Sequence, residues 1–390
     1  MYDFTHAPDR RGTDSVKWDV QPGELPMWIA DMDFATAPEI VAAMQQKLTL
    51  GAFGYEEPHA DYFHAVADWY ATEHGVPPDP AWMIFTTGVL PALSAIVRRM
   101  SHVGDSVLVQ TPVYNIFYNS IENSGRHVLT NELRYVHQQY EVDFDQLERQ
   151  LALPLTTMMI LCNPHNPVGK VWTRAELTRV ATLCRQYHVV LVSDEIHGDL
   201  VWRGPDYTPI FALPIPLIQQ TIALVSPSKT FNVAALHAAT VIVPNDHLRA
   251  QVSRGLNTDE VAEPNLLAIP GTIAAYTQGH AWLAALRQQL AANFAQARDF
   301  ITHHIPAVHV VASTATYLMW LNVGAVTDDA AALAASIRQE TGLIVSPGTI
   351  YHGNGNRFLR LNYACPPAML QDGLQRLDRG ITHYLQTRQD

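Results

Sequence analysis

Short apolar segments that alternate with helical patterns set the strongest limit on how this chain can fold. Each apolar segment is β-branched or rich in leucine and is bounded by Pro, Gly, Asp or Asn, as buried strands of parallel sheets are. The second helical segment begins with a capping box formed by Thr173 and Glu176. This alternation predicts an α/β fold, with helices on both faces of a mostly parallel sheet. The expected strands are residues 106–109, 158–161, 189–192, 222–225 and 240–243, and the expected helices are 91–100 and 173–187.

The pattern changes after residue 280. Trp282, Leu286, Leu290 and Phe294 recur every four residues, which predicts one long helix that reaches about His303. The looser alternation that follows indicates a smaller α+β domain. We therefore expect three parts: residues 1–50 as an N-terminal segment that contributes to the small domain, 51–280 as the large domain, and 281–390 as the small C-terminal domain.

Composition excludes several classes of protein. The formal net charge is −12, and no basic run is longer than Arg98-Arg99, so neither nucleic acid nor an anionic membrane surface is an expected partner. No apolar stretch approaches the roughly 20 residues that a membrane-spanning helix needs. The three cysteines are far apart, and the N-terminus has no basic or apolar leader. We therefore expect a cytoplasmic protein without structural disulfides.

The strongest chemical signal is Lys229, which follows the expected strand 222–225 between the hydroxyls of Ser228 and Thr230. Lysine is rarely buried, and burial favours its neutral amine, the form that makes a Schiff base. An exposed loop lysine is an equally good interpretation of this segment alone.

Two further strands end in polar residues. Asp194 follows strand 189–192, and Asn166 lies in the proline-flanked turn after strand 158–161. Ligands of open α/β sheets bind at the carboxyl ends of strands, where Asp194 could hold a protonated ring nitrogen and Asn166 could donate to an oxygen. A helix cap and an ordinary loop are the alternatives.

Two more segments suggest anion sites. Gly88 precedes the expected helix 91–100, whose free N–H groups could cradle a phosphate. Arg360 alternates with Leu359 and Leu361 in an expected strand, and a buried guanidinium favours a bidentate carboxylate. That carboxylate could belong to an amino acid or to a structural aspartate of the chain.

Taken together, these residues and their order resemble the fold-type I pyridoxal-phosphate enzymes of the class I/II aminotransferase superfamily, over nearly the whole chain. More narrowly, the sequence is similar to the MalY/PatB group of C–S lyases, which are cystathionine β-lyase-like. That resemblance implies a large cofactor-binding domain with a mostly parallel sheet and a smaller α+β domain. The segments that carry the resemblance are 25–34, 51–55, 87–91, 163–169, 193–197, 226–232 and 360–366.

The resemblance also implies roles for individual residues toward pyridoxal 5'-phosphate. Lys229 would bind the cofactor covalently and move the Cα proton, and Asp194 would pair with the ring nitrogen. Arg360 would bind the substrate carboxylate. Tyr55 would reach the phosphate and substrate of the other subunit, so a homodimer is expected. The other implied contacts are Asn166 with the phenolic oxygen, Tyr114 on the ring, Val89, Leu90, Ser226 and Ser228 with the phosphate, and His197 beside the cofactor.

Two departures from the aminotransferase pattern favour the lyase group. His237 stands where an arginine usually binds the phosphate, and His197 stands where a tyrosine is usual.

The expected reaction is α,β-elimination of L-cystathionine or a related sulfur amino acid to a thiol, pyruvate and ammonia. The main alternative is an aminotransferase. A regulatory protein that binds a transcription factor and a cofactor-free scaffold are weaker alternatives. No histidine spacing indicates a metal site.

Overall fold

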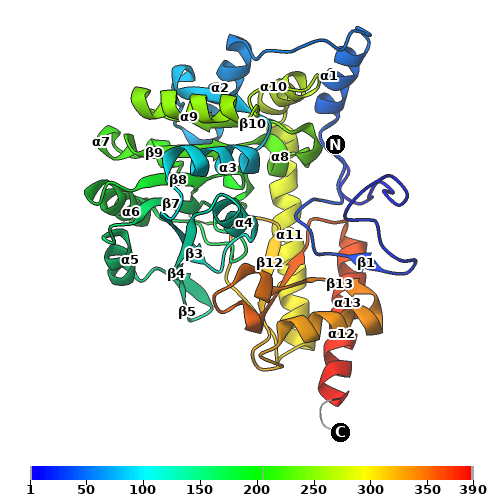
Figure 1. Ribbon diagram of the computed structural model, residues 1–390. Coiled ribbons are helices and arrows are strands. Elements are labelled where there is room, and N and C mark those ends of the chain that lie inside the picture. The colour runs from blue at the N-terminus through cyan, green and yellow to red at the C-terminus, as the bar shows by residue number, and fades with distance from the viewer. Residues whose placement is uncertain (1, 205, 388–390) are drawn as a thin grey trace.

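The computed structural model describes residues 2–204 and 206–387, and a seven-stranded sheet forms its centre (Figure 1). The strand order is β2-β10-β9-β8-β7-β3-β4, and only β10 runs antiparallel to its neighbours. The prediction of an α/β fold with a mostly parallel sheet is therefore confirmed. The strands are β2 (Met83–Thr86), β3 (Ser106–Thr111), β4 (His127–Glu132), β7 (Thr156–Cys162), β8 (Val190–Asp194), β9 (Thr221–Val225) and β10 (Ala239–Ile242).

Both faces of this sheet are covered, because successive side chains of each strand point to opposite sides. In β7, Met158 and Ile160 belong to one apolar cluster, whereas Met159 and Leu161 belong to the other. The first cluster includes α3 (Val89–Met100), α4 (Ile116–Glu122) and α9 (Asp246–Thr258). The second cluster includes α2 (Ala60–His74), α5 (Phe144–Leu151), α6 (Arg174–Gln186), α7 (Ile215–Ile218) and α10 (Ala268–Gln278).

Two expected helices are present with small shifts. The capping box of α6 is formed, with Thr173 N donating to Glu176 Oε2 at 2.9 Å and Glu176 N donating to Thr173 Oγ1 at 3.2 Å. Helix α3 begins at Val89, two residues earlier than expected, so Gly88 is its N-cap. The early start places the free N–H groups of α3 directly after β2.

A second, antiparallel sheet has the strand order β11-β12-β15-β14. The long helix α11 (His280–His304) runs from α10 to the helices beside this sheet (Figure 1). The predicted helix over 282–303 is thus present, whereas the domain boundaries at residues 50 and 280 stay predictions. The elements here are β11 (His309–Val310), β12 (Leu318–Asn322), β14 (Ser346–Pro347), β15 (Phe358–Asn362), α12 (Ala330–Thr341) and α13 (Pro367–Thr387).

The N-terminal segment reaches the second sheet's side of the molecule. Strand β1 (Leu25–Pro26) pairs in parallel with β13 (Leu343–Ile344).

None of the described helices is long and apolar enough to cross a membrane. The remaining elements are α1 (Pro38–Leu48), β5 (Arg134–Val136), β6 (Gln139–Glu141), α8 (Pro227–Thr230) and short 3₁₀ helices at Pro80–Trp82, Gly198–Leu200, Ile210–Ala212, Ala234–Leu236, Gly348–Tyr351 and Gly355–Arg357.

The parallel strands β3, β7, β8 and β9 bring their carboxyl ends to one edge. The loops after them are joined by main-chain bonds, since Asn163 N donates to Asp194 O and Glu195 N donates to Leu224 O, both at 2.9 Å. The polar motifs that follow these strands are therefore neighbours in space.

The turn after β7 packs tightly against the segment before β12. Gly169 has a φ of +69°, and a Cβ there would lie 1.9 Å from Ser313 Oγ. Gly12 has nearly the same φ, +70°, but a Cβ there would meet nothing within 4 Å. Substitution of these two glycines therefore separates the cost of a left-handed backbone from the cost of a steric clash.

We expect Gly169→Ala to destabilise the protein much more than Gly12→Ala. The left-handed backbone should cost each variant about 1 kcal/mol, and the clash should cost Gly169→Ala a further ~1–3 kcal/mol. Urea unfolding of both variants measures the difference. Equal losses of unfolding free energy would mean that Ser313 moves aside freely and that the turn is not held there.

Candidate active site

A cavity of about 240 Å³ lies at the carboxyl edge of the seven-stranded sheet. It brings together most of the residues that the sequence singled out, although they come from five separate segments. The predicted residues that line it are Val89, Leu90, Tyr114, Asn166, Asp194, His197, Ser228 and Lys229. The remaining lining residues are Ala30, Thr87, Gly88, Pro91, Cys162, Ile196, Ala234 and His237.

Lys229 lies in the four-residue helix α8, directly after the fully buried strand β9. Its Nζ donates to the carbonyl oxygen of Ala30 at 2.6 Å. Burial, assisted by the positive charge of Arg360, lowers the pKa of Lys229 to about 8, while Asp31 and Asp194 oppose the shift. The exposed-loop interpretation of Lys229 is therefore wrong, and a neutral amine becomes available slightly above neutral pH.

Asp194 is the last residue of β8 and accepts a hydrogen bond from Ile196 N at 3.1 Å. Burial raises the pKa of Asp194 to about 7, and the neighbouring Glu195 adds to this, although Ile196 N–H and Lys229 oppose it. A carboxylate that burial destabilises in this way gains from a cation placed beside it. Asp194 is thus suited to a protonated ring nitrogen.

Arg360 and Asn166 are both buried and lie in contact. Arg360 NH1 donates to Asn166 Oδ1 at 3.2 Å, and Arg360 NH2 donates to Trp28 O at 2.8 Å. Among the described residues, the hydrogen bonds of the Arg360 guanidinium go to these two uncharged oxygens and to no carboxylate, and its Nε has no hydrogen-bond partner. The alternative of a structural aspartate is therefore not what the structure shows. An unpaired buried guanidinium is suited to a carboxylate ligand.

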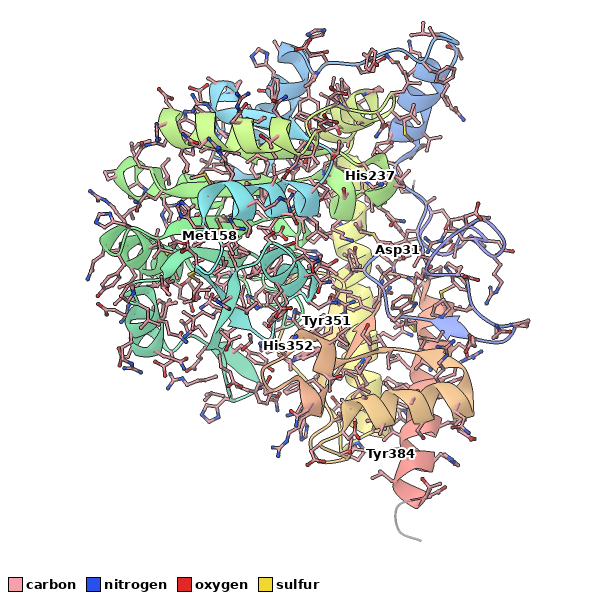
Figure 2. The ribbon with its side chains drawn as sticks, viewed as in Figure 1. Asp31, Met158, His237, Tyr351, His352 and Tyr384 are labelled. Atoms are coloured by element: carbon pink, nitrogen blue, oxygen red, sulfur yellow. The ribbon has the colours of Figure 1, made fainter. Side chains whose placement is uncertain are left out.

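The anion site expected near Gly88 is the N-terminus of α3. No side chain caps this helix, and the first bond within it runs from Ala92 N to Gly88 O at 3.1 Å. The N–H groups of Val89 and Leu90 precede that bond and lie at the cavity, as an anion site requires. His237 is exposed and also lines the cavity. Figure 2 labels it above Asp31.

Two aromatic side chains complete the walls. Burial raises the pKa of Tyr114 to about 12, so its phenol is neutral. Burial and the charges of Lys229 and Arg360 lower the pKa of His197 to about 3, so its imidazole is neutral as well. Within the described chain, His197 Nδ1 has no hydrogen-bond partner. These residues therefore offer flat surfaces without adding charge.

Three predicted residues lie outside the cavity lining. Arg360 lies behind Asn166, as described above. Ser226 caps α8, with its Oγ accepting from Ser228 N at 3.1 Å and donating to Ala238 O at 2.7 Å. Tyr55 is fully exposed, at 101 %, and borders a separate surface hollow. The prediction that Tyr55 enters another subunit's site therefore stays a prediction.

Sequence reasoning missed residues that act through the main chain or from a distant segment. The Ala30 carbonyl accepts from Tyr317 OH at 3.0 Å as well as from Lys229. Ala30 and Lys229 are 199 residues apart, and an alanine carries no chemical signal. Residues 25–34 carry part of the resemblance to the lyase group, but that resemblance predicted no role for Ala30.

Comparison with known proteins identifies the class. The family model "Aminotransferase class I and II" matches residues 26–377, and the chain belongs to this family. Cystathionine beta-lyase PatB of Bacillus subtilis is 38 % identical over 97 % of this chain and 100 % of that protein. Protein MalY of Escherichia coli is 36 % identical over 98 % of this chain and 99 % of that protein.

A solved structure agrees with this assignment. Cystalysin from Treponema denticola, which contains pyridoxal 5'-phosphate, superposes with a TM-score of 0.95 at 29 % identity, covering 98 % of this chain and 99 % of that one. The resemblance that the sequence motifs predicted is confirmed.

Proposed function

We propose that this chain is a pyridoxal-phosphate-dependent C–S β-lyase. Its substrate is L-cystathionine or a related sulfur amino acid, and its products are a thiol, pyruvate and ammonia. The observation that carries the proposal is one cavity in which burial lowers the pKa of Lys229 to about 8 and raises that of Asp194 to about 7. Opposite shifts of an amine and a carboxyl group are typical of active sites. The lyase names of PatB and other relatives support the choice of reaction.

The donor set of the cavity fits the cofactor. Lys229 would hold it covalently, Asp194 would face its ring nitrogen, and Asn166 would donate to its phenolic oxygen. When bound, pyridoxal phosphate supplies an electron sink for the carbanion left after loss of the Cα proton. The phosphate would lie on the N–H groups of Val89 and Leu90 with the hydroxyl of Ser228, and Ser226 would act through Ser228, whose Oγ lies 2.6 Å from its own. Tyr114 and His197 would lie against the ring.

The chain's own residues would bind the substrate and move its proton. Arg360 would bind the α-carboxylate, because its guanidinium is buried and, among the described residues, donates only to uncharged oxygens. The neutral Lys229 amine would accept the Cα proton, which requires a base with a pKa near the working pH. His197 is neutral, so it adds no charge beside Arg360 and Asp194.

An aminotransferase would use the same residues up to the removal of the Cα proton. It would then return that proton to another atom instead of losing a sulfur group from Cβ. The family model bears the aminotransferase name, so this is the second candidate.

We expect L-cystathionine or L-cystine to yield pyruvate and free thiol without any added keto acid. Because a thiolate leaves far more readily than hydride or carbon, turnover should exceed transamination of L-alanine or L-aspartate with 2-oxoglutarate by at least roughly tenfold, about 1.4 kcal/mol in barrier. Coupled pyruvate and thiol assays measure this, with Lys229→Ala as the inactive control. Turnover that required a keto acid and released no thiol would replace the lyase by the aminotransferase.

A homodimer and a cytoplasmic location are also part of the proposal. Leu50, Phe53 and Tyr55 are 68 %, 70 % and 101 % exposed in a connection without regular structure. Apolar side chains gathered in this way are suited to burial against a second copy of the chain. Tyr55 would then enter the partner's cavity. Three free, buried cysteines support a reducing compartment.

Hybrid dimers test the role of Tyr55. If it crosses to the partner, mixing inactive Tyr55→Phe with inactive Lys229→Ala subunits should restore activity, because each hybrid holds one site with both residues intact. Lys229→Ala mixed with Asp194→Asn is the matched control, because neither site of that hybrid is intact. Hybrids verified by mass that recover nothing would place Tyr55 outside the partner's site.

A further inference from the structure

Residues 29–34 contact Lys229 through the Ala30 carbonyl and are held by side chains from two distant parts of the chain. The proposed function assigns no role to these contacts. Asn362 Nδ2, on β15, donates to Ile29 O at 2.7 Å and to Asp31 O at 2.6 Å. The carbonyl between these two, that of Ala30, accepts from Lys229 Nζ at 2.6 Å.

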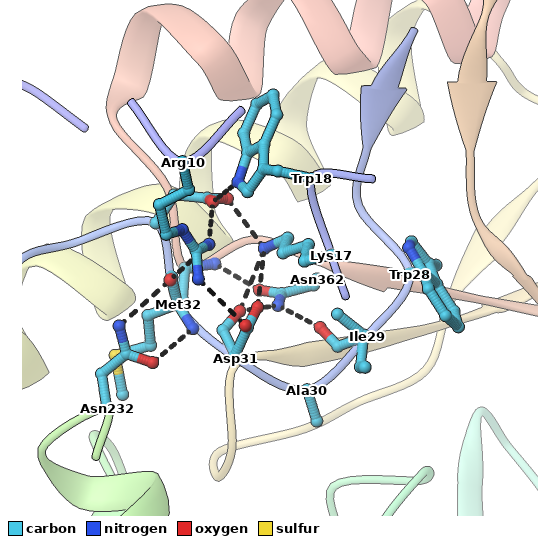
Figure 3. Close-up of polar contacts among 12 residues, drawn as sticks. Arg10, Lys17, Trp18, Trp28, Ile29, Ala30, Asp31, Met32, Asn232 and Asn362 are labelled. Atoms are coloured by element: carbon cyan, nitrogen blue, oxygen red, sulfur yellow. Dashed lines mark hydrogen bonds and ion pairs between the residues drawn. The ribbon is translucent and has the colours of Figure 1, made fainter. Parts of the chain in front are cut away.

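A second contact fixes this segment to the loop that carries Lys229. Asn232, three residues after the lysine, accepts from Met32 N at 2.9 Å and donates to Met32 O at 3.1 Å and Phe34 O at 2.9 Å. Figure 3 shows Asn232 and Asn362 on opposite sides of the segment. The amine and the carbonyl it contacts are therefore parts of one bonded unit.

A cluster of four charged residues adjoins this unit: Arg10, Lys17, Asp31 and Asp33. Figure 3 labels the first three. Lys17 Nζ and Asp33 Oδ2 are 2.8 Å apart, with side chains only 1 % and 2 % exposed. The guanidinium of Arg10 pairs with both carboxylates: its Nη1 lies 3.0 Å from Asp31 Oδ2, and its Nη2 lies 2.7 Å from Asp33 Oδ1. Trp18 Nε1 also donates to Asp33 Oδ1 at 2.8 Å. The two cations and two anions balance.

The cluster acts on the residue next to Ala30 in two ways. Lys17 Nζ donates to Asp31 O at 3.0 Å, and Arg10 binds the carboxylate of Asp31. That same carboxylate is the largest of the influences that raise the pKa of Lys229. A buried ion pair is weak evidence for stability, but removal of one partner is costly, because it leaves an uncompensated buried charge.

We propose that Arg10, Lys17, Asp31 and Asp33 are positioning residues for Lys229. Their ion cluster fixes residues 29–34 so that the Ala30 carbonyl holds the lysine amine and water stays away from it. An amine that donates N–H to a carbonyl keeps its lone pair free, as a base for the Cα proton requires. This inference rests on the proposed function only for the use made of that base.

The charged groups around Lys229 determine the sign of the expected effect. Asp31 and Asp194 favour the protonated amine, Arg360 disfavours it, and burial is the largest influence, also disfavouring it. The neutral His197 and the hydroxyl of Tyr317 complete the surroundings. Removing Arg10 leaves the charge of Asp31 less balanced and admits water to the amine. Both changes raise the pKa of Lys229.

The test uses Arg10→Gln in the full-length chain, first freed of cofactor. The chain has only four lysines, Lys17, Lys47, Lys170 and Lys229, so competitive acetylation with peptide mapping resolves each one. We expect the pH midpoint for Lys229 to rise by at least one unit, about a tenfold smaller neutral fraction at pH 7. The midpoint of the pH curve is compared, and not the extent of acetylation, because a looser segment also changes access of the reagent to the amine.

Hydrogen exchange and turnover give independent readouts. The amides of Met32 and Asp33 should exchange at least tenfold faster in Arg10→Gln, because their acceptors, Asn232 Oδ1 and Ala364 O, would be less well held. In the loaded enzyme, the acidic limb of the pH profile of kcat should also move to higher pH.

Two further variants make the outcome decisive. Arg338→Gln breaks the exposed bridge to Glu24, 2.7 Å long, which also ties the N-terminal segment to the rest of the chain, and it should change neither readout. Arg10→Lys keeps the positive charge but cannot bind two carboxylates through a planar guanidinium. It should therefore raise the Lys229 midpoint by less than Arg10→Gln does. If Arg10→Gln does not fold, Arg10→Lys provides the test.

An unchanged Lys229 midpoint in a folded Arg10 variant, or an equal shift in Arg338→Gln, would overturn the inference. The labelling result does not depend on lyase activity. A parent protein that cleaves no sulfur substrate would therefore refute the proposed function alone.

Discussion

Burial of the Lys229 amine is the constraint on which the site depends. A lysine in this place would be a poor base if water surrounded it, because its ordinary pKa is about 10.4. Packing at the end of β9 lowers that pKa to about 8, and a hydrogen bond to Ala30 O still satisfies the amine. The same burial raises the pKa of Asp194. The same burial therefore shifts the pKa of the base and that of the acid in opposite directions.

The sheet makes this burial possible by placing distant segments together. Adjacent parallel strands end at one edge, so Tyr114, Asn166, Asp194 and Lys229 meet without any of them being near another in sequence. The second sheet adds Arg360 through β15. Because backbone N–H groups of α3 face the same cavity, an anion can be held there with few formal positive charges.

The sequence predicted the five inner strands of the large sheet, the long helix α11 and eight of the sixteen residues that line the cavity. The strands and the helix have periodic patterns, and the cavity residues were found by their chemistry or by the resemblance to a known family. No pattern gave an expectation for short elements such as β5 and β6, or for α1. The sequence also left the roles of Arg10, Lys17 and Asp33 unassigned. Their contacts join segments by tertiary packing, and the carbonyl of Ala30 has no signature in any side chain.

Everything proposed for the site requires that Lys229 holds the cofactor. Borohydride reduction of the protein as purified, followed by peptide mapping, tests this directly, because the chain has only four lysines that could carry the pyridoxyl group. We expect the label on Lys229 in the parent chain and no label in Lys229→Ala. A pyridoxyl group on Lys17, Lys47 or Lys170, or an unlabelled parent that retains lyase activity, would contradict it.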